Sequence, residues 1–228
     1  MISSSSAIVL KRFPYGETSM IARCFTCEFG KMSFIIHGAR RKNSPLAAFL
    51  QPMNYVDLVF YNKQTRELQT VSKVAFNIPW LKIKDDLKKI TYGFALVELT
   101  DKCLLDGDTH KNLFKALVQA FSTIDSRKEQ LNLVFWYYQY QLLTLLGFRP
   151  DFSHRDVDHF PLPDPFSTSN SKIIFEAFQN GESGLNKGLK IIAADRKIVS
   201  EYLNIHLNAH FEGIQNLNSL QMFKDMPI

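Results

Sequence analysis

Three adjacent cations, Arg40, Arg41 and Lys42, are the residues of this sequence best suited to binding chemistry. They lie in the stretch Gly-Ala-Arg-Arg-Lys-Asn-Ser-Pro at residues 38–45, whose composition indicates a loop. Neighbouring guanidinium and ammonium groups can hold phosphates through charge-assisted hydrogen bonds. Exposed aromatic rings beside cations can also stack on the bases of single strands. Four further cations are interleaved with aromatic residues in the first third of the chain: Lys11, Arg12, Arg23 and Lys31.

Other reactive side chains form no recognisable catalytic or metal site. Cys24 and Cys27 have Cys-x-x-Cys spacing, but a strand would turn them to opposite faces, and no second pair follows to complete four ligands. Two histidines and two aspartates within residues 154–159 could hold a metal in a loop, although their spacing matches no known type of site. No nucleophile elbow, phosphate loop or dinucleotide fingerprint occurs. We therefore expect no enzymatic activity, no metal site and no cofactor.

The positive charge of the chain is concentrated in its first third. Residues 1–80 hold ten Lys or Arg and four Asp or Glu, a net charge of +6, whereas the other 148 residues hold 17 basic and 18 acidic groups, a net charge of −1. Such an excess is typical of a polyanion-binding surface, although a solvated face would have the same composition. The short apolar runs argue against a membrane segment, and three cysteines fit a reducing cytoplasm.

The cationic region has the pattern of a small β-barrel. Five segments alternate with the period of half-buried strands, at residues 7–13, 18–29, 31–37, 54–61 and 68–76. In the third segment, Met32, Phe34 and Ile36 share one face, so Phe34 is expected in the core rather than on a ligand. Five short strands favour a closed or nearly closed barrel, because closure removes exposed sheet edges.

After Pro79 the hydrophobic period becomes helical. Helices are expected over residues 83–105, 110–124, 126–146 and 172–180, and a last one from an Asp195 N-cap with Val199, Tyr202, Leu203, Leu207 and Phe211 facing inward. The third helix should bury one stripe that contains Leu131, Val134, Phe135, Tyr138 and Leu142. Residues 150–171, with four prolines, are expected to form an irregular insert. The sequence thus predicts an α+β protein, with a barrel in residues 1–79 and an all-helical domain in residues 80–228.

Several short motifs resemble the N-terminal signature of the bacterial recombination mediator RecO family. They are Gly-Glu-Thr-Ser at 16–19, Phe-Thr at 25–26, Gly-Lys at 30–31, Gly-Ala-Arg-Arg at 38–41 with Ser44, and Leu-Gln-Pro at 50–52. A weaker agreement follows at residues 145–148, Leu-Leu-Gly-Phe, with Pro150. One departure concerns the four-cysteine zinc module that many relatives carry after this segment, because residues 151–171 contain no cysteine.

The resemblance implies an OB-fold barrel followed by a helical domain. It also implies binding of single- and double-stranded DNA, annealing of complementary strands, and help in loading RecA onto strands coated with single-strand-binding protein. The implied protein partners are RecR and the acidic C-terminal tail of single-strand-binding protein. The family motifs match this chain best at Arg40 and Arg41, and also at Lys31.

The sequence therefore predicts a non-enzymatic, cytoplasmic and nucleoid-associated mediator of recombinational DNA repair. The expected DNA-binding residues are Arg40, Arg41, Lys42, Lys31, Arg23, Lys11 and Arg12. One alternative is a protein-interaction scaffold whose basic barrel binds acidic partners. A second, a metal-dependent nuclease, is disfavoured because the basic region has only four acidic residues and lacks a carboxylate cluster.

Overall fold

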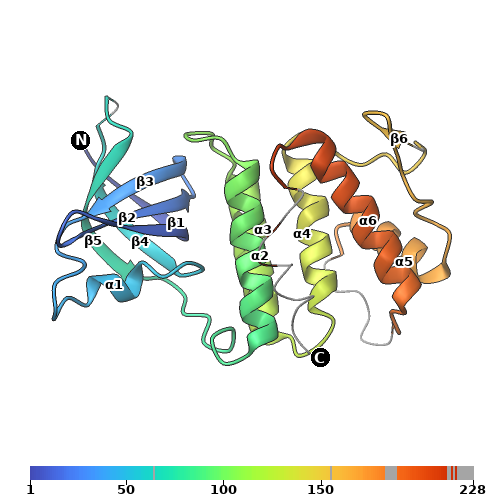
Figure 1. Cartoon of the computed structure of the whole chain (residues 1–228), viewed down its shortest axis with the longest axis horizontal. Helices are drawn as coiled ribbons and strands as arrows, with labels where there is room; N and C mark the ends of the chain where they lie inside the picture. The colour runs from blue at the N-terminus through green and yellow to red at the C-terminus, as the bar shows by residue number, and fades with distance from the viewer. Residues whose placement is uncertain (64, 155, 183–188, 215–216, 218, 220–228) are drawn as a thin grey trace.

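A closed five-stranded barrel forms the N-terminal part of the protein, and helices form the rest (Figure 1). The computed structural model describes all residues except 64, 155, 183–188, 215–216, 218 and 220–228. The barrel strands are β1 (Ile2–Tyr15), β2 (Ser19–Thr26), β3 (Gly30–Ile36), β4 (Tyr55–Tyr61) and β5 (Leu68–Phe76). Around the barrel they follow the order β1-β2-β3-β5-β4, with β3 and β5 parallel and the other neighbours antiparallel. This closed barrel confirms the predicted OB-fold.

Strand β1 is longer than the sequence pattern predicted, because it begins at Ile2 rather than at residue 7. Its first half pairs with β4 and its second half with β2, and a register shift between Val9 and Lys11 lies in the second half. Such irregularities bend a strand, and here β1 joins two neighbours and closes the barrel. The serine run has no hydrophobic alternation, yet Ser3 and Ser5 are buried against the barrel.

The barrel interior is built from alternating residues of β1, β2, β3 and β4. Phe34, Val56, Leu58 and Phe60 are almost completely buried, and the ring of Phe60 meets that of Phe34 edge to face at 5.0 Å. The expectation that Phe34 belongs to the core is confirmed.

The helical part contains each of the predicted helices. The helices are α2 (Leu87–Cys103), α3 (Lys111–Ser126), α4 (Leu131–Leu145), α5 (Ser169–Gln179) and α6 (Ala193–His210), while a four-residue helix, α1 (Leu46–Phe49), lies between β3 and β4. A small hairpin, β6 (Asp156–Val157) and β7 (Phe160–Pro161), lies within the predicted irregular insert. Figure 1 shows α2 and α3 beside the barrel and α5 and α6 at the far end of the molecule. Among the described residues, no helix is long and apolar enough to cross a membrane.

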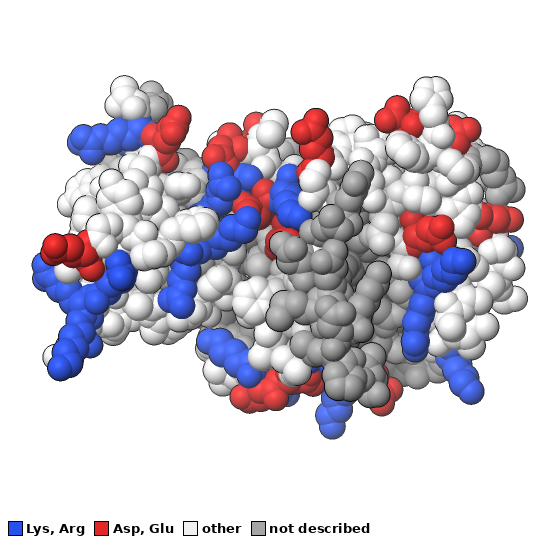
Figure 2. All heavy atoms as spheres, in the orientation of Figure 1, with Lys and Arg blue, Asp and Glu red and all other residues white. Residues whose placement is uncertain are grey.

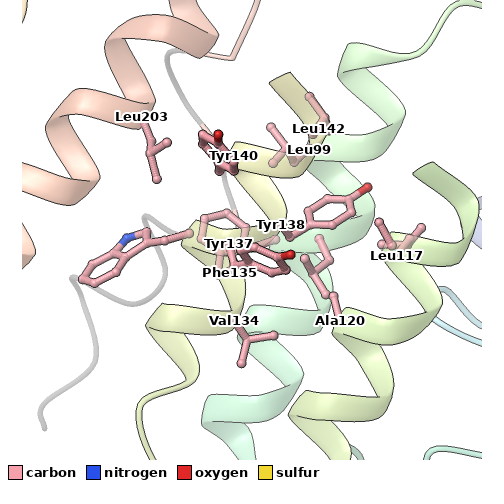
Figure 3. Packing of buried hydrophobic residues seen from close by; sticks show 14 of the residues in the cluster. Leu99, Leu117, Ala120, Val134, Phe135, Tyr137, Tyr138, Tyr140, Leu142 and Leu203 are labelled. Atoms are coloured by element: carbon pink, nitrogen blue, oxygen red, sulfur yellow. The ribbon is translucent and has the colours of Figure 1, made fainter. Parts of the chain in front are cut away.

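Two details of the predicted helices were wrong. Asp195 is not the N-cap of α6, because the helix begins at Ala193; the Asp195 carboxylate instead accepts a hydrogen bond from the Ile192 N–H at 2.9 Å, one turn back. Helix α4 buries more than the predicted stripe. Leu133, Trp136 and Tyr140 are buried as well, because α4 lies between α3 and α6 (Figure 3).

The barrel and the helices share one hydrophobic core. Phe25 of β2 meets Phe114 of α3 edge to face at 5.5 Å, and Trp80 stacks on Tyr55 of β4 and on Phe121 of α3. Because this core crosses the predicted boundary at residues 79 and 80, the division into two separate domains stays a prediction. The shared core thus packs the face of the barrel that carries Phe25 and Tyr55 against the helices.

Candidate nucleic-acid interface

The basic loop between β3 and α1 is attached to the turn that joins β1 and β2. The Arg40 N–H donates to the Thr18 carbonyl at 2.8 Å, and the Arg40 guanidinium donates to the Gly16 carbonyl at 2.9 Å. Ala39 is buried, and Gly38 has a φ of +72°, a conformation that favours glycine. The loop backbone is therefore held in place, and Arg41 and Lys42 extend from it into solvent.

Residues of β1 extend this exposed basic region. Lys11 and Arg12 are neighbours on a strand, so their side chains point to opposite sides. Arg12 points toward α1, where its guanidinium lies 3.4 Å from the Ala47 carbonyl. Tyr15 is about half exposed on the same strand and precedes Gly16, whose carbonyl accepts from the Arg40 guanidinium. We call Arg12, Tyr15, Arg40, Arg41 and Lys42 the loop surface.

The positive charge of the loop surface is not neutralised by ion pairs within the described part of the chain. No Asp or Glu there lies within 4.0 Å of the charged groups of Arg40, Arg41 or Lys42. Figure 2 shows Lys and Arg side chains gathered at the end of the barrel that lies away from the helices. Unpaired cations beside an exposed ring suit a ligand that carries both phosphates and flat bases.

Three of the predicted DNA-binding cations have a different environment. Lys11, Arg23 and Lys31 face the helices and surround Asp101 near the end of α2. The Lys11 ammonium lies 2.6 Å from the Asp101 carboxylate, and the Arg23 guanidinium lies 3.3 Å from that of Asp106. We call these three cations and two aspartates the seam cluster, because it joins the barrel to the helices.

Lys31, one of the predicted DNA-binding residues, lies between the barrel and the helices. It is 6% exposed, and its ammonium donates to the Asp101 carbonyl at 2.7 Å while lying 3.7 Å from the Asp101 carboxylate and 3.5 Å from that of Asp106. A cation at this position also interacts favourably with the carbonyl groups at the C-terminal end of α2. Lys31 is therefore occupied by protein groups and does not belong to the loop surface.

The sequence analysis did not identify Asp101 or Asp106 as partners of these cations. A signal was present, because Asp101 lies four residues after Val97 and three before Leu104, on the apolar side of α2. A carboxylate at such a position needs a buried partner. The sequence alone does not say that the partner comes from the barrel.

The remaining reactive residues that the structure describes do not assemble into a metal site. Cys24 is buried in the barrel, and burial raises the pKa of its thiol, which opposes thiolate chemistry. His154 pairs with Asp151 at 3.6 Å on the surface. Within the described residues, no group of three or more His, Cys, Asp or Glu could hold a metal ion.

Comparison with known proteins identifies the family of this chain. The family models described as "Recombination protein O N terminal" and "Recombination protein O C terminal" match residues 1–77 and 84–183. The DNA repair protein RecO of Chloroherpeton thalassium is 35% identical over 182 residues, which cover 79% of this chain and 70% of that protein. The chain belongs to the RecO family.

Other RecO relatives differ in how much of their length is matched. The DNA repair protein RecO of Salinibacter ruber is 36% identical over 149 residues, which cover 65% of this chain and 57% of that protein. The DNA repair protein RecO of Flavobacterium johnsoniae is 24% identical over an alignment that covers 97% of this chain and 98% of that protein. The resemblance of residues 16–52 to the RecO family signature is confirmed.

Proposed function

We propose that this chain is a non-enzymatic, DNA-binding mediator of recombinational DNA repair, and that the loop surface is where it contacts DNA. The proposal rests on the basic loop of residues 38–45, whose backbone is held by the hydrogen bonds of Arg40. Arg41 and Lys42 are exposed on it without a carboxylate partner among the described residues. Membership of the RecO family supports a role in DNA repair, since the relatives carry that name.

The proposed mechanism is electrostatic. Cations of the loop surface neutralise backbone phosphates, and this lowers the repulsion between two complementary strands, so that they can pair. Tyr15 provides a flat ring beside the cations, on which unpaired bases can stack. This arrangement requires no acid, base or metal and reads no particular sequence, so single- and double-stranded DNA should both bind.

The finer parts of the proposal follow the family. We propose that the protein anneals strands and helps to load RecA on DNA coated with single-strand-binding protein. Its protein partners would be RecR and the acidic tail of single-strand-binding protein. A cytoplasmic, nucleoid-associated location follows from this role.

Titration of labelled DNA by the double variant Arg41→Ala/Lys42→Ala tests the loop surface. Arg40 is left unchanged because its guanidinium also holds the Gly16 carbonyl. Each lost phosphate contact should weaken binding about tenfold. It should also reduce the slope of log affinity against log salt by about 0.7 for single strands and 0.9 for duplex.

A matched control is Lys172→Ala/Lys197→Ala, which removes two exposed cations from α5 and α6. We expect this variant to bind DNA as the unchanged protein does. Equal affinities and salt slopes for the loop variant and the control would overturn the assignment. Absence of DNA binding by the unchanged protein at low salt would instead favour the scaffold alternative, in which the barrel binds acidic proteins.

A further inference from the structure

His37 lies at the junction between strand β3 and the basic loop. It follows Ile36, the last residue of β3, and its side chain is exposed. The His37 Nδ1 and the Ser19 hydroxyl are hydrogen-bonded at 3.1 Å. Strand pairing brings these two side chains together, because Ser19 begins β2 and its neighbour Met20 pairs with Ile36. The imidazole is therefore held between the β1–β2 turn and the basic loop.

The same junction carries the arginines of the loop surface. Arg40 is bonded to the β1–β2 turn through both its backbone and its guanidinium. The Arg41 side chain lies along Gly38, the residue that follows His37. A Cβ at Gly38 would lie 3.5 Å from the Arg41 Nε and 3.8 Å from its Cζ. His37 thus adjoins the cations proposed to bind DNA and can contact the same stretch of phosphates.

The hydrogen bond to Ser19 leaves the other ring nitrogen of His37, Nε2, available to a ligand. Within the described part of the chain, Nε2 has no protein partner. When the Ser19 hydroxyl donates to Nδ1 of the neutral ring, the ring proton lies on Nε2. When the ring is protonated, both nitrogens donate, and a hydrogen bond from Nε2 to a phosphate becomes charge-assisted, which makes it roughly twice as strong. His37 is thus a phosphate donor whose strength depends on pH.

The surroundings of His37 hold more positive than negative charge. Glu17, on the β1–β2 turn, is the acidic residue of the adjoining segments, and it forms no ion pair with His37 among the described residues. A phosphate bound at this junction would supply the negative charge that stabilises an imidazolium, so a proton and a phosphate favour each other's binding. The other titratable and charged side chains of the adjoining elements are Tyr15 on β1, Arg40, Arg41 and Lys42 in the loop, and Lys73 on β5, which runs parallel to β3.

We propose that His37 is a further phosphate-binding residue of the loop surface, positioned by Ser19, and that it strengthens DNA binding as the pH falls from about 8 to about 6. This inference rests on the proposed DNA-binding function. Histidines gain their charge in this interval, and one added charged contact can strengthen binding by up to about tenfold. Because histidines are commonly only partly charged at a pH of about 6, we expect the affinity for single strands to rise about fivefold. The slope of log affinity against log salt should steepen by up to about 0.7.

The test is a titration of a labelled thymidine oligonucleotide with the full-length protein, followed by anisotropy at both pH values and at several salt concentrations. His37→Gln keeps a donor but cannot become charged, so it should lose the rise in affinity. His37→Lys is charged throughout, and at the higher pH it should bind about as tightly as the unchanged protein does at the lower pH. Ser19→Ala should reduce the rise, because Nδ1 loses its partner. The matched control, His154→Gln, changes an exposed histidine that lies 3.6 Å from Asp151, and it should keep the full rise.

Circular dichroism at both pH values checks that each variant is folded. The inference is overturned if His37→Gln shows the same rise as the unchanged protein, or if the unchanged protein binds DNA equally well at the two pH values. A rise that survives in Ser19→Ala would remove Ser19 from the proposal. These results leave the proposed function standing as long as Arg41→Ala/Lys42→Ala weakens binding. Failure of the unchanged protein to bind DNA at either pH would instead overturn the proposed function, and this inference with it.

Discussion

The seam cluster yields the sharpest prediction for stability. Asp101 is 5% exposed, and its carboxylate forms ion pairs with three cations. One of them, Lys31, is as deeply buried as Asp101. The substitution Asp101→Asn keeps the size of the side chain and removes its charge. Three positive groups then face one another across the seam, and the one remaining carboxylate, Asp106, is largely exposed.

The magnitude follows from the burial of Lys31. Removing one partner of a buried pair costs about 3–5 kcal/mol, because the other charge is left without compensation. We expect a loss at the lower end of this range, about 3 kcal/mol. The Lys31 ammonium would still donate to the backbone carbonyl of residue 101 at 2.7 Å and pair with the Asp106 carboxylate at 3.5 Å. In a protein of this size such a loss lowers the melting midpoint by about 6–12 °C.

Urea denaturation followed by circular dichroism measures the change in the free energy of unfolding. The matched control is Asp106→Asn, which should cost less than about 1 kcal/mol because this carboxylate is exposed. Adding Lys31→Met to Asp101→Asn should recover part of the loss, since both buried charges are then absent. If Asp101→Asn destabilises no more than Asp106→Asn, the electrostatic account of the seam is wrong.

Three further predictions concern other parts of the molecule. Lys11→Ala should leave the salt slope of DNA binding unchanged, because the Lys11 ammonium is already paired at 2.6 Å; a slope that falls as in the loop variant would contradict this. Gly30→Ala should destabilise the protein more than Gly16→Ala in urea melts. Both glycines have positive φ, which costs about 1–2 kcal/mol for alanine. A Cβ at Gly30 would in addition clash with the Asp108 carbonyl oxygen, whereas nothing lies within 4 Å of a Cβ at Gly16. Burial lowers the pKa of His206 to about 4, below the ordinary 6.5, so between these values the unfolded chain binds a proton that the folded chain does not. The contribution of His206 to the free energy of unfolding should therefore fall by about 2 kcal/mol from pH 7 to pH 5, and parallel melts of His206→Leu should lose that part of the pH dependence.

The barrel could be predicted from the sequence because its strands carry a local signal. In β3 and β4 every second residue is apolar, and the structure buries most of that set, including Phe34 and Val56. The start of β1 had no such signal, since serines favour no strand by themselves. Pairing of residues 2–8 with β4 supplies the hydrogen bonds that extend the strand, and this partner lies about fifty residues away in the sequence.

The candidate site likewise has a part that could be predicted from the sequence and a part that could not. The cations of residues 40–42 could be predicted because a run of charge in a loop is solvated wherever the loop lies. Lys31 carries the same charge and follows a family motif, yet its surroundings depend on α2, which is distant in the sequence. Strand alternation placed Lys31 opposite the barrel core, but it could not show that helices cover that face.

What the sequence by itself determined is therefore local: the period of each element, the position of the basic loop and the motifs of the RecO family. The tertiary structure decided which cations remain free. Docking of α2 against the barrel brings Asp101 and Asp106 to Lys11, Arg23 and Lys31, and it leaves the basic loop of residues 40–42 in solvent. The physical reason is that a charge is neutralised by whatever lies within a few ångströms of it in space, and sequence distance does not report that separation.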